Sequence, residues 1–167
     1  MVEDTELLES HTSLTSELLV RRGAPPRTSR LVPHIQLDQF PPPEIAEELL
    51  HRSLALPFVR SRQSRMASPR TRALWLPDIC AAGPPDAFID GGEFCHLHPL
   101  PDGTIHVTLP KGLRELAFHL GWAEPHAVTR IGCMPESLVL VYPPRNRAEL
   151  DAVFSLIRGS YDFARAL

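Results

Sequence analysis

Residues 93–109, EFCHLHPLPDGTIHVTL, decide the fold because they contain two short alternating segments joined by a Pro-Asp-Gly turn. Side chains alternate across a strand, so His96 and His98 share one face of the first segment. In the second segment, His106 takes one face and Ile105 takes the opposite, apolar face. Pairing around the turn places His106 roughly opposite His96. The stretch therefore predicts an antiparallel hairpin that carries three imidazoles on one face.

The same alternation assigns the neighbours of these histidines to faces of the hairpin. It places Phe94 on the side of the histidines and directs Glu93 and Cys95 the other way. We therefore expect Cys95 to be an unreactive core residue. Glu93 is expected to be a solvated carboxylate at the end of the strand.

The rest of the chain mixes predicted helices with predicted strands. The clearest helix begins after Asn146, a good N-cap, and carries apolar residues at three- and four-residue steps. Gly121 suits the end of a helix over 111–120, because glycine adopts the left-handed conformation readily. This pattern predicts a single α+β domain with a mainly antiparallel sheet packed by helices. Its other expected elements are a helix from 41–43 to about 54, a loop over 59–69, and strands over 72–76, 87–89 and 137–142.

Length and composition set the domain organisation. The 167 residues, 43% hydrophobic and 22% charged, suit one globular domain with a substantial core. Residues 1–22 are polar with a short amphipathic pattern and are interpreted as a flexible or helical N-terminal arm. Residues 23–33 are rich in Pro and Arg and should be extended along the surface. We assign 23–167 to the α+β domain.

Several classes of function are disfavoured by composition. The net charge of −3 argues against general binding of nucleic acid or of anionic membranes. No apolar run approaches the roughly 18–20 residues of a membrane span, and the acidic start does not resemble a signal peptide. Three cysteines without zinc-type spacing fit a reducing, cytoplasmic environment. Lys111 is the only lysine among 17 basic residues, which suggests a high-GC bacterial genome.

The histidines allow three interpretations from their residue type and spacing. They are compatible with an ordinary polar strand face. They are equally compatible with a metal site for zinc or iron built from His96, His98 and His106. An imidazole near neutral pKa is also a good general base for an acidic enol or phenol. Spacing alone does not choose between these interpretations.

Downstream residues extend the candidate site. His126 follows a proline in a loop, from which a side chain can reach a site, and is a candidate fourth member. Trp122 either fills the edge of the core or lines a pocket. Arg145, close to the start of the last helix, is either a surface arginine or a group that holds an anionic oxygen. The histidines left unassigned to the site are His11, His34, His51 and His119.

Taken together, these residues resemble the luciferase-like domain family, which includes fungal luciferases acting on 3-hydroxyhispidin and many bacterial proteins of about this length. The resemblance covers about 23–164 and is strongest after residue 93. Pro99 stands where the fungal enzymes carry a polar residue, and we expect no counterpart of their membrane-anchoring N-terminus. The motifs that carry the resemblance are Glu93-Phe94-Cys95-His96-Leu97-His98, Thr104-Ile105-His106-Val107, Gly121-Trp122 with His126, and Tyr142-Pro143-Pro144-Arg145-Asn146.

The resemblance implies an oxygenase that needs no metal or organic cofactor. In the fungal case an electron-rich hydroxypyrone reacts directly with O2, forms an endoperoxide, loses CO2 and yields an excited product. Here it implies a base among His96, His98, His106 and His126, with Arg145 holding the resulting anion. The other residues expected to bind substrate are Trp122, Tyr142, Thr104 and Thr108.

The expected partners are therefore a small enolic or phenolic molecule and O2. We expect a role in secondary metabolism, without light emission. Two alternatives stay open at this point. One is a metalloenzyme with zinc or iron held by histidines. The other is a non-catalytic module that binds a small molecule or a protein, for which the Pro/Arg-rich segment offers an extended arm.

Overall fold

The protein's structure, a computed structural model, describes residues 18–167 and confirms the α+β fold. Its sheet has six strands, every neighbouring pair of which is antiparallel, in the order β1-β2-β3-β4-β6-β5. The expected arm over 1–22 falls mostly on residues outside the described range and stays a prediction. The strands are β1 (Arg60–Gln63), β2 (Arg72–Trp75), β3 (Glu93–Leu97), β4 (Ile105–Thr108), β5 (Ala123–Pro125) and β6 (Leu138–Val141).

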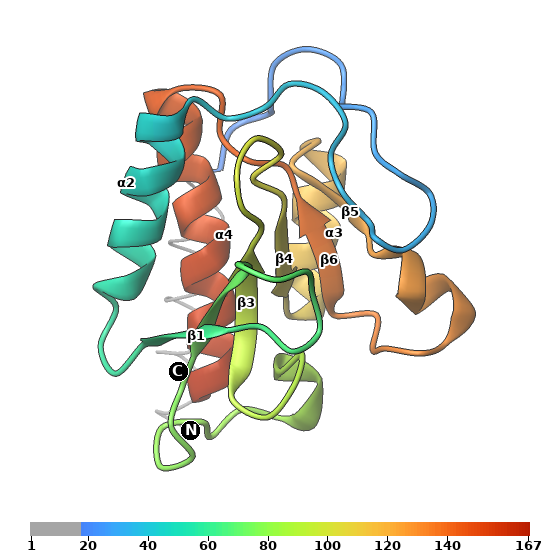
Figure 1. Cartoon of the computed structure of the whole chain (residues 1–167). Helices are drawn as coiled ribbons and strands as arrows, with labels where there is room; N and C mark the ends of the chain where they lie inside the picture. The colour runs from blue at the N-terminus through green and yellow to red at the C-terminus, as the bar shows by residue number, and fades with distance from the viewer. Residues whose placement is uncertain (1–17) are drawn as a thin grey trace, which may run out of the picture.

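Helices cover one face of this sheet. The long helix α4 (Arg147–Arg165) lies against β3 and β4, between α2 (Pro43–Leu54) and α3 (Lys111–His119) (Figure 1). Helices α3 and α4 approach closely at Gly159, where an added Cβ would lie 2.2 Å from Leu113 Cδ2. None of the helices in 18–167 has the length and apolar character that crossing a bilayer requires.

The core lies between the helices and the sheet. Alternate residues of β4 and β6, such as Ile105 and Val139, join it together with Leu150 and Ile157 of α4. Residues at the intervening positions, such as His106, lie outside this core cluster. The sheet therefore has one apolar face under the helices and a second face, without helices, that carries polar groups.

The predicted hairpin forms with the predicted register. His96 pairs directly with His106 across β3 and β4. Between the strands, Asp102 Oδ1 accepts a hydrogen bond from the Thr104 N–H at 2.9 Å, and Gly103 has a φ of 58°. This turn chemistry is typical of Asp-Gly pairs. The local sequence alone is therefore sufficient to align the two histidines.

A β-bulge at the start of β3 changes the alternation that we expected there. Leu74 pairs with Cys95 and Trp75 pairs with Glu93, so Phe94 is an extra residue in the ladder. Phe94 accordingly lies in the core, with its ring centroid 6.2 Å from that of Tyr161. The expectation that Phe94 lies beside the histidines is wrong, and Glu93 returns to the histidine face. Cys95 is in the core, as expected.

Elsewhere the structure confirms some predicted elements and corrects others. Asn146 caps α4, with its Oδ1 accepting from the Glu149 N–H at 3.0 Å. The expected strand over 87–89 is wrong: a 3₁₀ turn, Pro85–Ala87, begins at a proline pair. The expected loop over 59–69 contains β1, whose four exposed residues show no hydrophobic alternation.

Candidate active site

Five histidines gather on the sheet face that lacks helices. The hairpin supplies His96, His98 and His106, the start of the 3₁₀ turn Ala127–Ile131 supplies His126, and the N-terminal segment supplies His34. All five side chains are buried. The ring of His106 is central, with centroids 4.9 Å from His96 and His98 and 4.4 Å from His126. The structure thus brings the four predicted histidines together and adds a fifth.

His34 was not predicted because it lies far from the hairpin in a segment without periodicity. Its Nε2 lies 2.8 Å from Glu124 Oε1, while its Nδ1 accepts from the Ala127 N–H at 3.2 Å. The His34 imidazole is therefore the neutral tautomer, which donates from Nε2 to Glu124. Glu124 also accepts from Thr28 Oγ1 and from the Tyr142 hydroxyl, at 2.7 and 2.9 Å. These donors lower the pKa of Glu124 against the opposing effect of its burial, so this carboxylate anchors the segment over the sheet.

The direction of the hydrogen bonds inside the cluster follows from one backbone carbonyl. His106 Nε2 lies 2.9 Å from the carbonyl oxygen of His34, which can only accept, so Nε2 carries a proton. Burial, followed by the neighbouring imidazoles, lowers the pKa of His106 and keeps it neutral. Its Nδ1 must then accept, and the donor is His96 Nε2 at 2.8 Å.

The hydrogen bond between His96 and Glu93 contains a single proton, shared by an imidazole nitrogen and a carboxyl oxygen. His96 Nδ1 lies 2.6 Å from Glu93 Oε1, and Ser64 Oγ donates to the same oxygen at 2.8 Å. Because His96 already donates from Nε2, one proton serves Nδ1 and Oε1 together. Glu93 is fully buried, and its Oε2 has no hydrogen-bond partner among the described residues. Glu93 is thus the second member of the cluster that the sequence reasoning placed elsewhere.

Two imidazole nitrogens, His98 Nε2 and His126 Nε2, have no hydrogen-bond partner among residues 18–167. His126 Nδ1 accepts from the Val128 N–H at 3.3 Å, so the neutral ring carries its proton on Nε2. His98 Nε2 is buried without a partner among residues 18–167, and its Nδ1 lies 3.8 Å from Asp102 Oδ1. This carboxylate favours a proton on Nδ1 and a lone pair on Nε2. Burial and the neighbouring imidazoles lower the pKa of both His98 and His126 to about 4.

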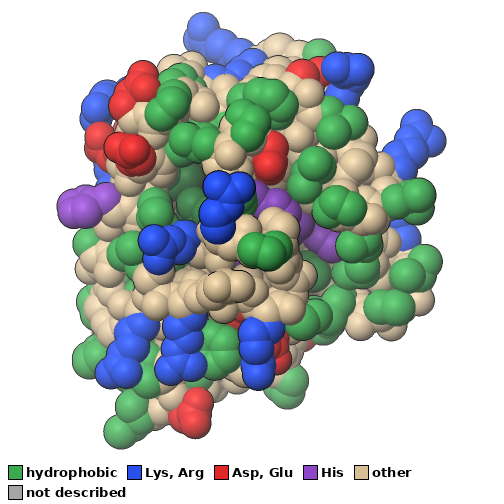
Figure 2. Space-filling view, in the orientation of Figure 1, with side chains coloured by type: hydrophobic (Ala, Val, Ile, Leu, Met, Phe, Trp, Pro, Cys, Tyr) green, Lys and Arg blue, Asp and Glu red, His purple; other side chains and the backbone are tan. Residues whose placement is uncertain are grey.

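A cavity of about 640 Å³ opens beside the cluster. Histidine atoms are visible in a hollow near the middle of the space-filling view (Figure 2). Arg65, at the rim, forms an ion pair with Asp90 at 2.6 Å. The remaining wall is mainly apolar and includes Val32, Pro33, Ile89, Val128, Leu138, Met66 and Met134. An apolar cavity with a few convergent polar groups is the usual form of a small-molecule site.

Residues 91–160 match the family model described as the Luciferase domain. This segment of the chain is therefore similar to the luciferase-like domain family. No curated protein and no solved structure matched the chain. The matched segment holds Glu93 and the four predicted histidines, whereas His34 precedes it.

Five residues that were expected to bind substrate do not line this cavity. Trp122 is buried, and its indole N–H donates to the Leu19 carbonyl at 2.6 Å. The Arg145 guanidinium pairs with Glu149 in α4. Substrate binding by this group stays a prediction without support from the cavity lining. Its members are Trp122, Tyr142, Arg145, Thr104 and Thr108.

Two overlapping groups of three histidines have candidate metal-ligand atoms within 4.8 Å of one another. One is the predicted set His96, His98 and His106, and the other combines His106 with His34 and His126. A metal-bound imidazole nitrogen must offer a lone pair. Both nitrogens of His106 are engaged, one as donor and one as acceptor. Either group would therefore hold zinc or iron only after a hydrogen bond of His106 is broken.

Proposed function

We propose that this luciferase-like domain is an enzyme that makes an acidic enol or phenol react directly with O2. The observation that carries the proposal is that His98 and His126 both line one cavity and each has an imidazole nitrogen without a hydrogen-bond partner among the described residues. His98 Nε2 offers a buried lone pair, and His126 Nε2 offers a proton. A base and a hydrogen-bond donor are the two groups that formation of an enolate requires.

Proton transfer is the first step. His98 accepts the acidic proton of the substrate, and His126 Nε2–H donates to the enolate oxygen. Both rings are neutral at pH 7 because the pKa of each is lowered to about 4. The enolate is an opposite charge beside His98, so its formation raises the pKa of that imidazole and holds the proton there.

Reaction with O2 is the second step. The enolate gives one electron to O2, and the resulting carbon radical and superoxide combine to form a C–O bond. The peroxide then takes the proton from His98, which returns to its neutral form. Substrate and O2 thus become a hydroperoxide, with carbon oxidised and oxygen reduced by two electrons. His96, His106 and Glu93 would fix the rings around this reaction.

Oxygen uptake tests the proposal. Protein freed of metals by chelation is mixed with a series of 3-hydroxy-2-pyrones and phenols while dissolved O2 is recorded. We expect uptake with a member of the series, reduced about 100-fold or more in His98→Gln. His119→Gln changes an exposed histidine outside the cluster and should retain full activity. Uptake that His98→Gln leaves unchanged would refute the assigned base.

The two groups of neighbouring ligand atoms favour one second candidate, a histidine-ligated metalloenzyme. In that case the purified protein should hold zinc or iron at one equivalent per chain, and His106→Ala should release it. Because His106 belongs to both groups, this substitution tests either site. Oxygen uptake that disappears on chelation and returns with metal would replace the metal-free proposal with this one.

A further inference from the structure

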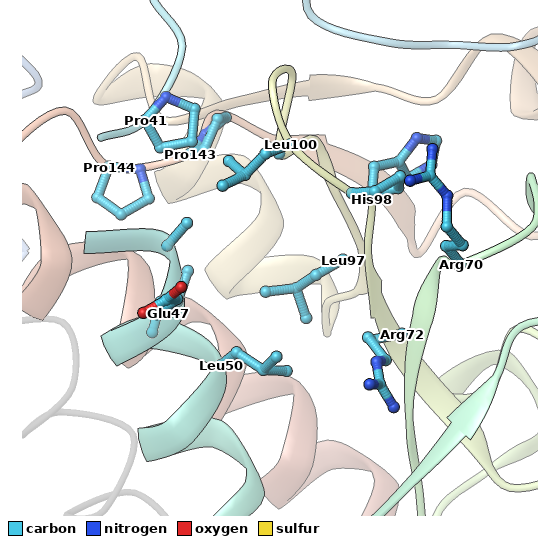
Figure 3. A pocket seen from close by; sticks show the side chains of 14 residues that line it. Pro41, Glu47, Leu50, Arg70, Arg72, Leu97, His98, Leu100, Pro143 and Pro144 are labelled. Carbon is cyan, nitrogen blue, oxygen red and sulfur yellow. The ribbon is translucent and has the colours of Figure 1, made fainter. Parts of the chain in front are cut away.

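A second cavity lies on the helix side of the sheet, between α2 and the tip of the β3–β4 hairpin. It has a volume of about 230 Å³ and is separate from the larger cavity in its lining, except that His98 borders both. Figure 3 shows Leu50, Leu97 and Leu100 directed into this space. The helix–sheet layer is therefore incompletely filled at this end.

The size and the walls of the second cavity indicate the hydrophobic part of a ligand. Its volume corresponds to about eight water molecules at ~30 Å³ each, enough for roughly ten non-hydrogen atoms. The wall at the proline end, formed by Pro41, Pro143 and Pro144, is also apolar.

The polar end of the ligand is indicated by two arginines. Arg72 pairs with Leu97 across β2 and β3, which places both side chains on the helix side of the sheet. Arg70 also lines the cavity and has a φ of 73°, a conformation uncommon for a residue with a side chain (Figure 3). Neither arginine contacts a carboxylate among the described residues; Arg72 has only a 3.4 Å contact with Ser61 Oγ. Glu47 borders the cavity from α2, on the opposite side.

We propose that this second cavity binds a small apolar carboxylic acid, with its carboxylate at Arg70 and Arg72 and its hydrocarbon part against Leu50, Leu97 and Leu100. The position of Glu47 gives the ligand one orientation, because a carboxylate is repelled from the α2 side. Arginine presents a planar set of donors that suits a carboxylate. The site is independent of the proposed oxygenase reaction, although His98 forms a wall of both cavities.

Octanoate and octan-1-ol form a matched pair of probes for this site. Titration at pH 7 is followed by calorimetry and by nuclear magnetic resonance of methyl groups and imidazoles. We expect octanoate to shift the methyl signals of Leu50 and Leu97 and the ring signals of His98, and to bind about tenfold more tightly than the alcohol. Signals of His34, which lines only the larger cavity, should stay in place.

Variants separate the cavity from nonspecific binding. Arg72→Gln should weaken octanoate binding about tenfold, whereas Arg60→Gln, on the exposed strand β1, should not change it. Ala46→Leu places a larger side chain at the cavity wall and should abolish binding in a protein whose Tm shows that it is folded. Equal binding of acid and alcohol, or unchanged binding by Ala46→Leu, would overturn the proposal. None of these readouts depends on oxygen uptake.

Discussion

His106 donates a hydrogen bond from Nε2 to the backbone carbonyl of His34, a residue 72 positions earlier in the chain, at 2.9 Å. A carbonyl has no proton to give, so this contact fixes which nitrogen of His106 is protonated. Because His106 Nδ1 must then accept, His96 Nε2 is the donor to it, and His96 Nδ1 is the atom that faces Glu93. One carbonyl group thus fixes the donor and the acceptor in the hydrogen bond between the two buried imidazoles.

Substitutions of Glu93 test this assignment. Glu93→Leu removes the 2.6 Å partner of His96 Nδ1 and leaves it only Ser64 Oγ at 3.5 Å, so it should lower the free energy of unfolding by about 1–3 kcal/mol. Glu93→Gln retains an amide that can donate to Nδ1 while His96 is neutral, so it should cost less than half as much. Urea unfolding at pH 7 measures both values. If the two variants were equally unstable, the hydrogen bond would not be what Glu93 contributes.

As the pH is lowered from 7, the protein should begin to lose stability at pH values above those at which carboxylates ordinarily titrate. The pKa of His98 and of His126 is lowered from 6.5 to about 4 in the folded state. Between these two values the unfolded chain binds more protons, so stability is complete above about pH 6.5 and falls as the pH approaches 4. Urea unfolding at pH 7, 5.5 and 4.5 measures the loss. His98→Gln should make the loss smaller, whereas His119→Gln should leave it as it is.

Glu124 should control how firmly the N-terminal segment is held. Glu124→Gln replaces an oxygen acceptor of His34, Thr28 and Tyr142 with an amide and should cost about 1–2 kcal/mol. Proteolysis near residues 28–36 should become faster, as read from fragment masses over time. Tyr142→Phe removes one donor and keeps the carboxylate, so its cleavage rate should stay close to that of the original protein. Faster cleavage in Tyr142→Phe than in Glu124→Gln would contradict the anchoring role.

The N-cap of α4 gives a prediction about stability alone. Asn146→Ala removes the acceptor for the Glu149 N–H and should lower stability by about 1 kcal/mol. Asn146→Asp preserves an acceptor and should stay within a few tenths of a kcal/mol of the original. Thermal unfolding followed by circular dichroism compares them. The cap is not a determinant of stability if alanine and aspartate give the same Tm.

The sequence supports prediction of the hairpin because strand alternation and the Asp-Gly turn are local properties. His96 and His106 pair as expected for that reason. Glu93 was misassigned because a bulge depends on how β2 pairs with β3, and nothing in residues 93–98 alone announces the extra residue. His34 was missed because its position depends on tertiary contacts with Glu124 and Ala127.

The same distinction applies to the residues expected to bind substrate. The family resemblance suggested the role for the group, and the nearby start of a helix suggested it for Arg145 as well. Arg145 forms an ion pair with Glu149, and the indole N–H of Trp122 donates to the carbonyl of Leu19. Sequence order alone does not reveal which polar groups of a fold are consumed by its own packing.

The residues that line the larger cavity come from two parts of the chain. The hairpin histidines lie inside the matched segment 91–160, whereas Val32, Pro33, His34 and residues 65–68 lie before it. The proposed reactive groups and part of the cavity wall are therefore encoded in separate stretches of the gene. Under the proposed function, changes confined to the earlier stretches would alter the shape of the cavity while leaving the hairpin histidines in place.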